Sequence, residues 1–166
     1  KNQLNVIKAM IDTDIDVVFI GGPVTADDKY YQECLTIAKG KNNFHFIGWV
    51  DNNSLLLKSA YTNAKVFLFP SYHETFGLVL LEAAVAGANL VVSKSLPILD
   101  FPSMNVCTRI DPNKLEDIRN KVMKAFIKEK DVNQINRILK DFSWKEVPEQ
   151  QHNNNRRDQQ ASCIDD

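Results

Sequence analysis

Two glutamates stand at the ends of the stretch ETFGLVLLE, at a point where a strand gives way to a helix. Glu74 and Glu82 flank a mostly apolar run that contains Gly77 and follows the strand-like segment VFLFPS. Unpaired backbone N–H groups and the macrodipole at a helix N-terminus favour an anion. A glycine there lets the anion approach the backbone, because it has no Cβ. We therefore expect a phosphate to bind at residues 75–77.

The two carboxylates suit hydroxyl groups, because their like charge would repel a phosphate. Glu82, about a turn and a half into the predicted helix, can accept hydrogen bonds from both hydroxyls of a ribose. Glu74, in the preceding loop, can accept hydrogen bonds from a second sugar. Ribose, phosphate and sugar together make a nucleotide-sugar. The spacing alone leaves another interpretation open, in which Glu82 is a solvated helix residue and Glu74 complements the helix dipole.

The elements that must position these residues alternate along the chain. The expected strands are residues 16–23, 43–50, 65–71, 89–94 and 104–112, and the expected helices are residues 2–11, 26–40, 52–64, 75–88, 113–130 and 131–142. Asn2 is a candidate N-cap of the first helix. This alternation predicts βαβ units and a parallel sheet with helices on both faces. Right-handed crossovers make the expected fold α/β, a Rossmann-like doubly wound sheet.

Length and charge restrict the function further. The 166 residues fit one domain, and the formal net charge of -1 argues against a general affinity for nucleic acid or anionic lipid. No apolar run reaches membrane-spanning length, and the start does not resemble a signal peptide. Residues 148–166 are rich in Gln, Asn and charge, which is typical of a flexible tail.

The cysteines indicate thiols rather than a metal site. Cys34, Cys107 and Cys163 are far apart and show no ligand spacing, which argues against structural zinc. We expect two reduced, buried thiols and one thiol in the tail. Reduced thiols favour a cytoplasmic location.

Other strand ends offer weaker candidates. The GxGxxG and Walker A motifs are absent, and Gly21 in the run GGP is as consistent with a tight turn as with a ligand contact. Lys94 and Ser95 follow another predicted strand and are weak candidates for ligand contact.

Two histidines are expected to be structural. His73 precedes Glu74 and could touch a ligand, although a structural role in the loop is favoured. His45 alternates with Phe44 and Phe46 in a predicted strand, so its side chain faces away from both.

The flanking sequence resembles a known family. FLFPSYHETFGLVLLEAAVAGANLVVSK is similar to the retaining, nucleotide-sugar-dependent glycosyltransferases of family 4, with their E-x7-E motif. Upstream, VVFIGG, NFHFIGWVDNN and LLKSAYTNAKVFLFPS match the same family in order, and RIDPNKLEDI and DFSWKEV match it downstream. The resemblance implies that residues 1–147 are the donor-binding, C-terminal half of a two-domain GT-B enzyme.

The resemblance also implies roles for individual residues. Glu74 would hold the donor sugar, and Glu82 the ribose diol. The backbone amides of Phe76, Gly77 and Leu78 would bind the sugar and the distal phosphate.

A cation and a base site complete the implied site. Lys1 would bind the diphosphate and stabilise it as a leaving group. Trp49 and Val50 would lie where the family holds the base, although Trp49 is equally consistent with a half-buried aromatic residue. No metal is expected, because Lys1 and helix dipoles can neutralise the diphosphate.

Two features of the family are missing from this sequence. The strand that carries the family arginine should precede Lys1, and it would be central in the sheet, between residues 17–22 and 66–71. Its absence leaves backbone groups unpaired, so either another segment fills the gap or the sheet is imperfect there. The N-terminal acceptor-binding domain is missing too. We therefore expect this chain alone to bind donor poorly and to catalyse little or nothing.

The implied enzyme transfers a sugar to an acceptor, and its family often builds surface polysaccharides or glycolipids. Peripheral contact with the cytoplasmic face of the membrane is compatible with that role. Two alternatives stay open: a nucleotide-sugar epimerase of the same architecture and a non-catalytic nucleotide-binding module. The E-x7-E spacing and the downstream FSW favour the transferase.

Overall fold

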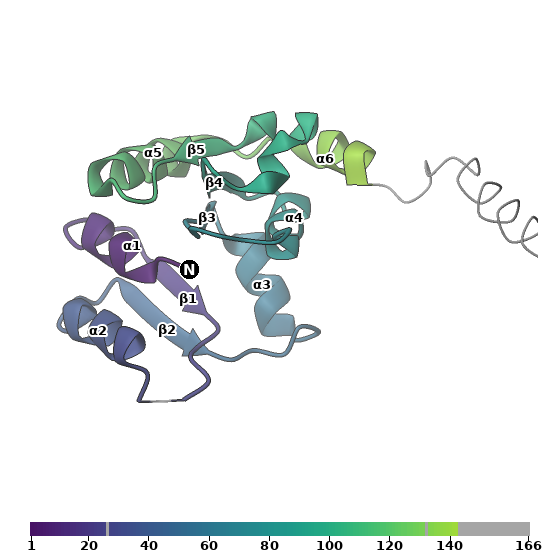
Figure 1. Ribbon diagram of the computed structural model, residues 1–166. Helices are drawn as coiled ribbons and strands as arrows, with labels where there is room; N and C mark the ends of the chain where they lie inside the picture. Colours follow the sequence, from purple (N-terminus) through teal and green to yellow (C-terminus); the bar gives the residue numbers. More distant parts are fainter. Residues whose placement is uncertain (26, 132, 143–166) are drawn as a thin grey trace, which may run out of the picture.

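Five parallel strands in the described residues form two separate sheets (Figure 1). One sheet pairs β1 (Val17–Ile20) with β2 (Phe44–Gly48). The other has the order β3 (Val66–Phe69), β4 (Asn89–Ser93), β5 (Thr108–Ile110). The computed structural model describes residues 1–142 except 26 and 132, without the side chains of 135 and 139–141. The predicted tail at 148–166, Cys163 and the end of the predicted domain lie outside the described residues.

Helices connect and cover the strands. They are α1 (Gln3–Met10), α2 (Lys29–Ala38), α3 (Leu55–Asn63), α4 (Leu78–Val85), α5 (Leu115–Ile127) and α6 (Gln134–Phe142), with the short 3-10 helices η1 (Pro97–Asp100) and η2 (Pro102–Val106). The predicted α/β class with parallel strands is confirmed. Among the described residues, no strand lies between β1 and β3, so the sheet is interrupted where the sequence predicted a gap.

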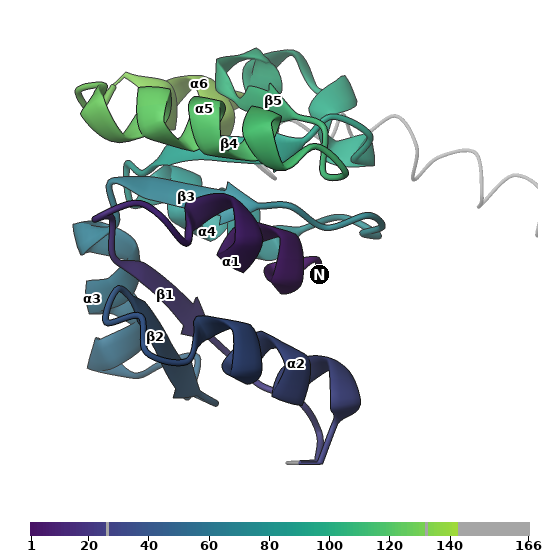
Figure 2. The same cartoon turned by 90° about the vertical axis from the view of Figure 1, so that its left-hand side faces the viewer.

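A shared core holds the two sheets together despite the gap. Ile7 and Met10 of α1 are fully buried in a cluster that includes Phe44 of β2, Val91 of β4 and Ile118 of α5. Figure 2 shows α1 at the level between β1 and β3, where its apolar face reaches residues of both sheets. Burial of apolar surface therefore joins parts that lack hydrogen bonds to each other.

A second cluster lies on the opposite face of the larger sheet. Leu80 of α4 and Ile138 of α6 pack there with Val92 and Met104, and all are nearly inaccessible to solvent. The larger sheet is thus covered on both faces, as predicted. The smaller sheet differs, because alternate residues such as Val18 and Ile47 remain exposed on the face away from α1 and α2.

Several element ends differ from the predicted ones, some for identifiable local reasons. Helix α4 is shorter than residues 75–88, because Gly77 and Gly87 adopt left-handed backbone angles that a helix cannot contain. Residues before β5 form η2 instead of a strand, since Pro102 has no N–H for a ladder and suits the first position of a helix. Asn2 precedes α1 as expected, but its φ of 66° leaves the side chain without a capping bond.

Candidate functional site

The site begins with how the first residues of the chain are anchored. The buried amide of Asn2 donates hydrogen bonds to the backbone oxygens of Pro70 (3.3 Å) and Pro112 (2.9 Å). Pro70 directly follows β3, and Pro112 lies two residues beyond the end of β5. Asn5 donates to the Pro112 oxygen as well, at 3.0 Å. The side chain that a regular N-cap would use on its own helix thus ties α1 to the carboxyl edge of the larger sheet.

This anchoring places Lys1 against Glu74. The Lys1 ammonium donates a hydrogen bond to the Glu74 carboxylate, and the Lys1 Nζ also lies 6.0 Å from the centre of the Phe69 ring. The side chain of Glu74 is only 13% exposed, whereas that of Lys1 is 62% exposed. Partial burial raises the pKa of Glu74, but the hydrogen bond and the charge of Lys1 outweigh it and hold the pKa below its ordinary value.

The turn into α4 lies beside this pair. Gly77 has φ of 84°, and a Cβ at this position would lie 3.1 Å from Cε1 of Phe69. Within the described residues, the N–H groups of Phe76, Gly77 and Leu78 donate no hydrogen bond. They precede or begin the first turn of an α-helix, where free N–H groups and the dipole attract anions.

These groups surround one open hollow of about 320 Å³. Its lining consists of Lys1, Phe69, Glu74, Thr75, Phe76, Gly77, Leu78 and Val79. The structure therefore brings together five of the predicted site residues, which combine a cation, a carboxylate and a helix N-terminus. Phe69 and Val79 were missed by the sequence analysis. Their apolar character indicated only a core strand and a helix, and gave no sign of which side chains would face the hollow.

The ring of Phe76 packs against two other aromatic rings. Its centroid lies 6.3 Å from that of Phe101 and 5.9 Å from that of Phe142, both nearly perpendicular to it. Edge-to-face packing of this kind fixes the loop against α6. Phe76 still lines the hollow and remains partly exposed, and within the described residues its backbone N–H donates no hydrogen bond.

Glu82 is set apart from the hollow. It lies in the second turn of α4, is exposed, and is not among the lining residues. Its Oε2 accepts a hydrogen bond from the hydroxyl of Tyr61 on α3, at 2.7 Å. Burial, followed by this bond to Glu82, raises the pKa of Tyr61 far above its ordinary value. Nothing in the sequence indicated Tyr61, since a tyrosine at helical spacing is usually a core residue.

The remaining predicted binding residues gather at the end of the smaller sheet. The Gly21 N–H donates to the Gly48 oxygen at 2.8 Å, and Gly21 has φ of 100°. Trp49 is 78% exposed, with its ring within 3.8 Å of where a Cβ on Gly22 would lie. Val50 is half-buried. Gly21, Trp49 and Val50 do not line the hollow beside α4, so the predicted site falls into two groups on two sheets.

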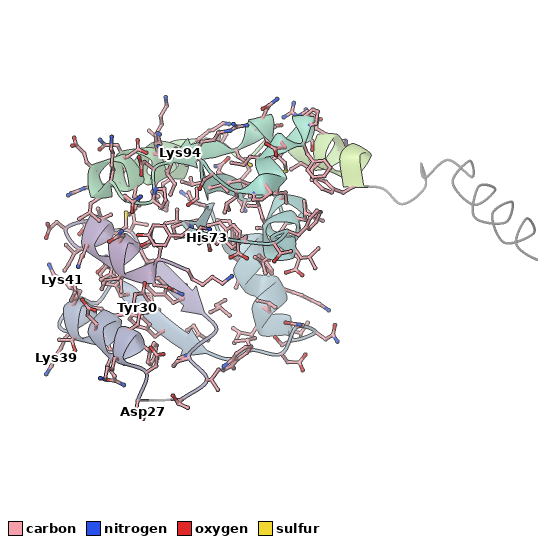
Figure 3. The ribbon with its side chains drawn as sticks, in the orientation of Figure 1. Asp27, Tyr30, Lys39, Lys41, His73 and Lys94 are labelled. Carbon is pink, nitrogen blue, oxygen red and sulfur yellow. The ribbon has the colours of Figure 1, made fainter. Side chains whose placement is uncertain are left out.

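Of the weaker candidates, Lys94 and His45 each contact an aspartate, whereas Ser95 and His73 are exposed. Lys94 donates to Asp111 at 2.9 Å and thereby lowers the pKa of Asp111. Ser95 beside it is exposed. His45 is exposed and contacts Asp16 Oδ1 at 2.8 Å, in line with its expected structural role. His73 is exposed near the loop before α4 (Figure 3).

Two of the three cysteines lie within the described residues. Cys34 and Cys107 are free and buried, as expected. Across the described residues, no cluster of three or more His, Cys, Asp or Glu could hold a metal ion. In the same part of the chain, no helix has the length and apolar character needed to cross a membrane.

Comparison with solved structures identifies the fold. Sucrose-phosphate synthase from Thermosynechococcus elongatus superposes with a TM-score of 0.68 at 22% identity, over 97% of this chain and 42% of the synthase. At that level of identity, the likeness concerns the fold. The chain spans less than half the length of this structure.

Comparison of sequences identifies the family. An uncharacterized glycosyltransferase of Methanocaldococcus jannaschii is 39% identical over 70 residues, which cover 42% of this chain and 17% of the archaeal protein. The family model described as "Glycosyl transferases group 1" matches residues 1–142. The predicted resemblance to glycosyltransferases is thereby confirmed. The chain therefore belongs to the group 1 glycosyl transferase family.

Proposed function

We propose that this chain is the donor-binding, C-terminal domain of a retaining family 4 glycosyltransferase that moves a sugar from a nucleotide diphosphate to an acceptor. One observation carries the proposal: Lys1 and Glu74 face each other beside the free N–H groups of residues 76–78, around one hollow. This arrangement offers positive charge and a hydroxyl acceptor within the same small space.

The cationic part of the hollow suits the diphosphate. The Lys1 ammonium and the N-terminus of α4 both attract phosphate oxygens. As the bond between sugar and diphosphate breaks, negative charge builds on the leaving group, and Lys1 offsets that charge. Lys1 would exchange its contact with Glu74 for one with the diphosphate. We expect no metal ion to be needed, because these groups supply the positive charge.

The carboxylates suit the two sugars. Once Lys1 moves to the diphosphate, Glu74 accepts hydrogen bonds from hydroxyls of the transferred sugar. Glu82 accepts hydrogen bonds from the ribose diol. Gly21, Trp49 and Val50, at the end of the smaller sheet, would contact the base.

The rest of the activity would come from a second domain. In the GT-B architecture, the acceptor is bound by another domain, and closure of the two domains would bring the acceptor to the sugar held at the hollow. We propose that the transferred sugar is a hexose and that the product is a polysaccharide or a glycolipid. By itself, the present chain would be inactive. Free Cys34 and Cys107 support a cytoplasmic location, with acceptors reached at the membrane face.

A ligand screen tests the proposal. The melting temperature of the full-length protein is measured with UDP-, GDP- and ADP-sugars, and one class should raise it by mass action. Glu74→Gln should weaken the rise, whereas the exposed Glu116→Gln on α5 serves as the matched control and should preserve it. If no nucleotide-sugar stabilises the protein, or if the two variants respond alike, the proposal is wrong.

The retaining mechanism needs its own measurement. With the donor class known, the anomeric configuration of the new glycosidic bond is read by nuclear magnetic resonance. We expect it to equal that of the donor. An inverted product would contradict the retaining assignment, and release of an epimerised nucleotide-sugar without acceptor would replace the transferase proposal by an epimerase.

A further inference from the structure

Tyr61, which is not among the predicted site residues, donates a hydrogen bond to the carboxylate of Glu82, which is. Tyr61 lies near the end of α3, half-buried, with its ring centroid 5.9 Å from that of Phe67 on β3. From this packed position its hydroxyl reaches Oε2 of Glu82 on α4, at 2.7 Å. The helices α3 and α4 lie side by side in both ribbon views (Figures 1 and 2). A side chain fixed by one helix thus fixes a side chain of the next.

The contact determines how Glu82 can present its oxygens. Glu82 is exposed, so without a partner its side chain would sample several rotamers. The Tyr61 phenol is a donor throughout the physiological range, because its pKa is raised by burial and then by Glu82 itself. Each carboxylate oxygen has two lone pairs. Tyr61 occupies one on Oε2, and within the described residues Oε1 accepts no hydrogen bond.

This geometry matches a pair of neighbouring hydroxyls. A ribose offers two adjacent hydroxyl donors, at its 2′ and 3′ positions. They can hydrogen-bond to Oε1 and to the remaining lone pair of Oε2 only when the plane of the Glu82 carboxylate faces both of them. A 2′-deoxyribose offers one of these donors and gains less from the same alignment. The orientation set by a third group therefore affects the two sugars unequally.

We infer that Tyr61 is a positioning residue, which holds the Glu82 carboxylate in register with a ribose diol and so increases the preference for ribonucleoside over 2′-deoxyribonucleoside diphosphates. The inference rests on the proposed role of Glu82 as the ribose acceptor. It adds a residue from a different helix, whose role is exerted through Glu82 and not by contact with the nucleotide.

The test compares affinity ratios in the full-length protein. Dissociation constants are measured by calorimetry for UDP, GDP and ADP and for their 2′-deoxy counterparts, and the pair that includes the tightest ligand is used. Tyr61→Phe keeps the ring and removes the hydroxyl. We expect it to weaken binding of the ribonucleotide by about three- to tenfold and that of the deoxynucleotide less, so that their ratio falls.

A second tyrosine provides the matched control. The hydroxyl of Tyr30 on α2 accepts a hydrogen bond from the backbone N–H of Leu4 at 3.0 Å, and Figure 3 shows Tyr30 on the α2 side of the molecule. Tyr30→Phe therefore removes a hydroxyl and its hydrogen bonds elsewhere in the molecule, and it should leave the affinity ratio unchanged. Because the ratio compares two ligands on one variant, a general loss of stability cancels from it.

Glu82→Gln separates the inference from the function on which it rests. If Glu82→Gln abolishes the ribose preference and Tyr61→Phe leaves it intact, the role of Tyr61 is refuted and the proposed function stands. If Glu82→Gln itself leaves the ratio unchanged, the ribose assignment fails and the inference falls with it. A reduced ratio in both variants, with Tyr30→Phe like the wild type, supports the inference.

Discussion

The ammonium of Lys1 contacts the carboxylate of Glu74, 73 positions away in the sequence, and the pair closes one side of the hollow at the start of α4. The contact depends on Asn2, whose buried amide holds the adjacent backbone to the ends of β3 and β5. In the proposed function, a bound diphosphate would compete with Glu74 for the ammonium of Lys1.

Removing the charge of Lys1 should weaken diphosphate binding. In Lys1→Gln the hollow keeps the N–H groups of residues 76–78 but loses its cation, so we expect the affinity for nucleoside diphosphate to fall by about tenfold or more. Titration calorimetry of the full-length protein measures the change. Lys39→Gln, at an exposed lysine that follows α2, is the matched control and should bind normally. Equal affinities in the two variants would show that Lys1 does not bind the diphosphate.

The same pair should make stability depend on acid pH. Since the pKa of Glu74 is held below its ordinary value of 4.5, its ionised form stabilises the fold. The contribution is fully present above pH 4.5 and is lost as the pH falls through the lower pKa of the folded state. Asp117 acts in the same direction, because hydrogen bonds from Lys121 and from the Asp111 backbone lower its pKa.

Urea titrations at a series of pH values between neutrality and strong acid measure this effect as the free energy of unfolding. In Lys1→Gln the acid-induced loss should be smaller than in the wild type, because the pKa of Glu74 then lies nearer its unfolded value. An identical pH profile would show that the pair contributes nothing to stability.

The order of elements and five of the eight residues that line the hollow could be predicted from the sequence, for identifiable reasons. Continuous apolar runs indicated the buried strands, and the helix N-terminus after β3 followed from Gly77 and the acids around it. The role of Asn2 escaped prediction, because it depends on Pro112, a residue 110 positions away. Tyr61 escaped for the same reason, since only packing of α3 beside α4 brings it to Glu82.

Gly77 should be intolerant of a side chain for two separable reasons. Its φ of 84° is unfavourable for any residue with a Cβ, and that Cβ would lie 3.1 Å from the Phe69 ring. Gly40 has a similar φ of 79° but has open space around it. We expect Gly40→Ala to lower the free energy of unfolding by about 1–2 kcal/mol, and Gly77→Ala to lower it by about 1–3 kcal/mol more. Urea unfolding of both variants gives the difference, and equal losses would exclude a clash with Phe69.

The interrupted sheet should be visible in hydrogen exchange. Strand β4 is buried along its whole length and pairs with β3 and β5, whereas within the described residues β1 pairs only with β2, and alternate side chains on it are exposed. Local opening costs least where few buried contacts break. We therefore expect amides of β1 to exchange at least about tenfold faster than those of β4, corresponding to a difference of about 1.4 kcal/mol in opening free energy.

Exchange followed residue by residue by nuclear magnetic resonance makes the comparison within one molecule, with β2 as the internal reference. Strand β2 pairs with β1 on one side and carries Phe44 into the shared core, so its inward residues should exchange more slowly than those of β1. If β1 were as well protected as β4, its edge would be paired in solution and the gap between β1 and β3 would be closed. Protection that is low in β1 and high in β4 means that the shared core beneath α1, rather than a continuous ladder of hydrogen bonds, holds the two sheets together.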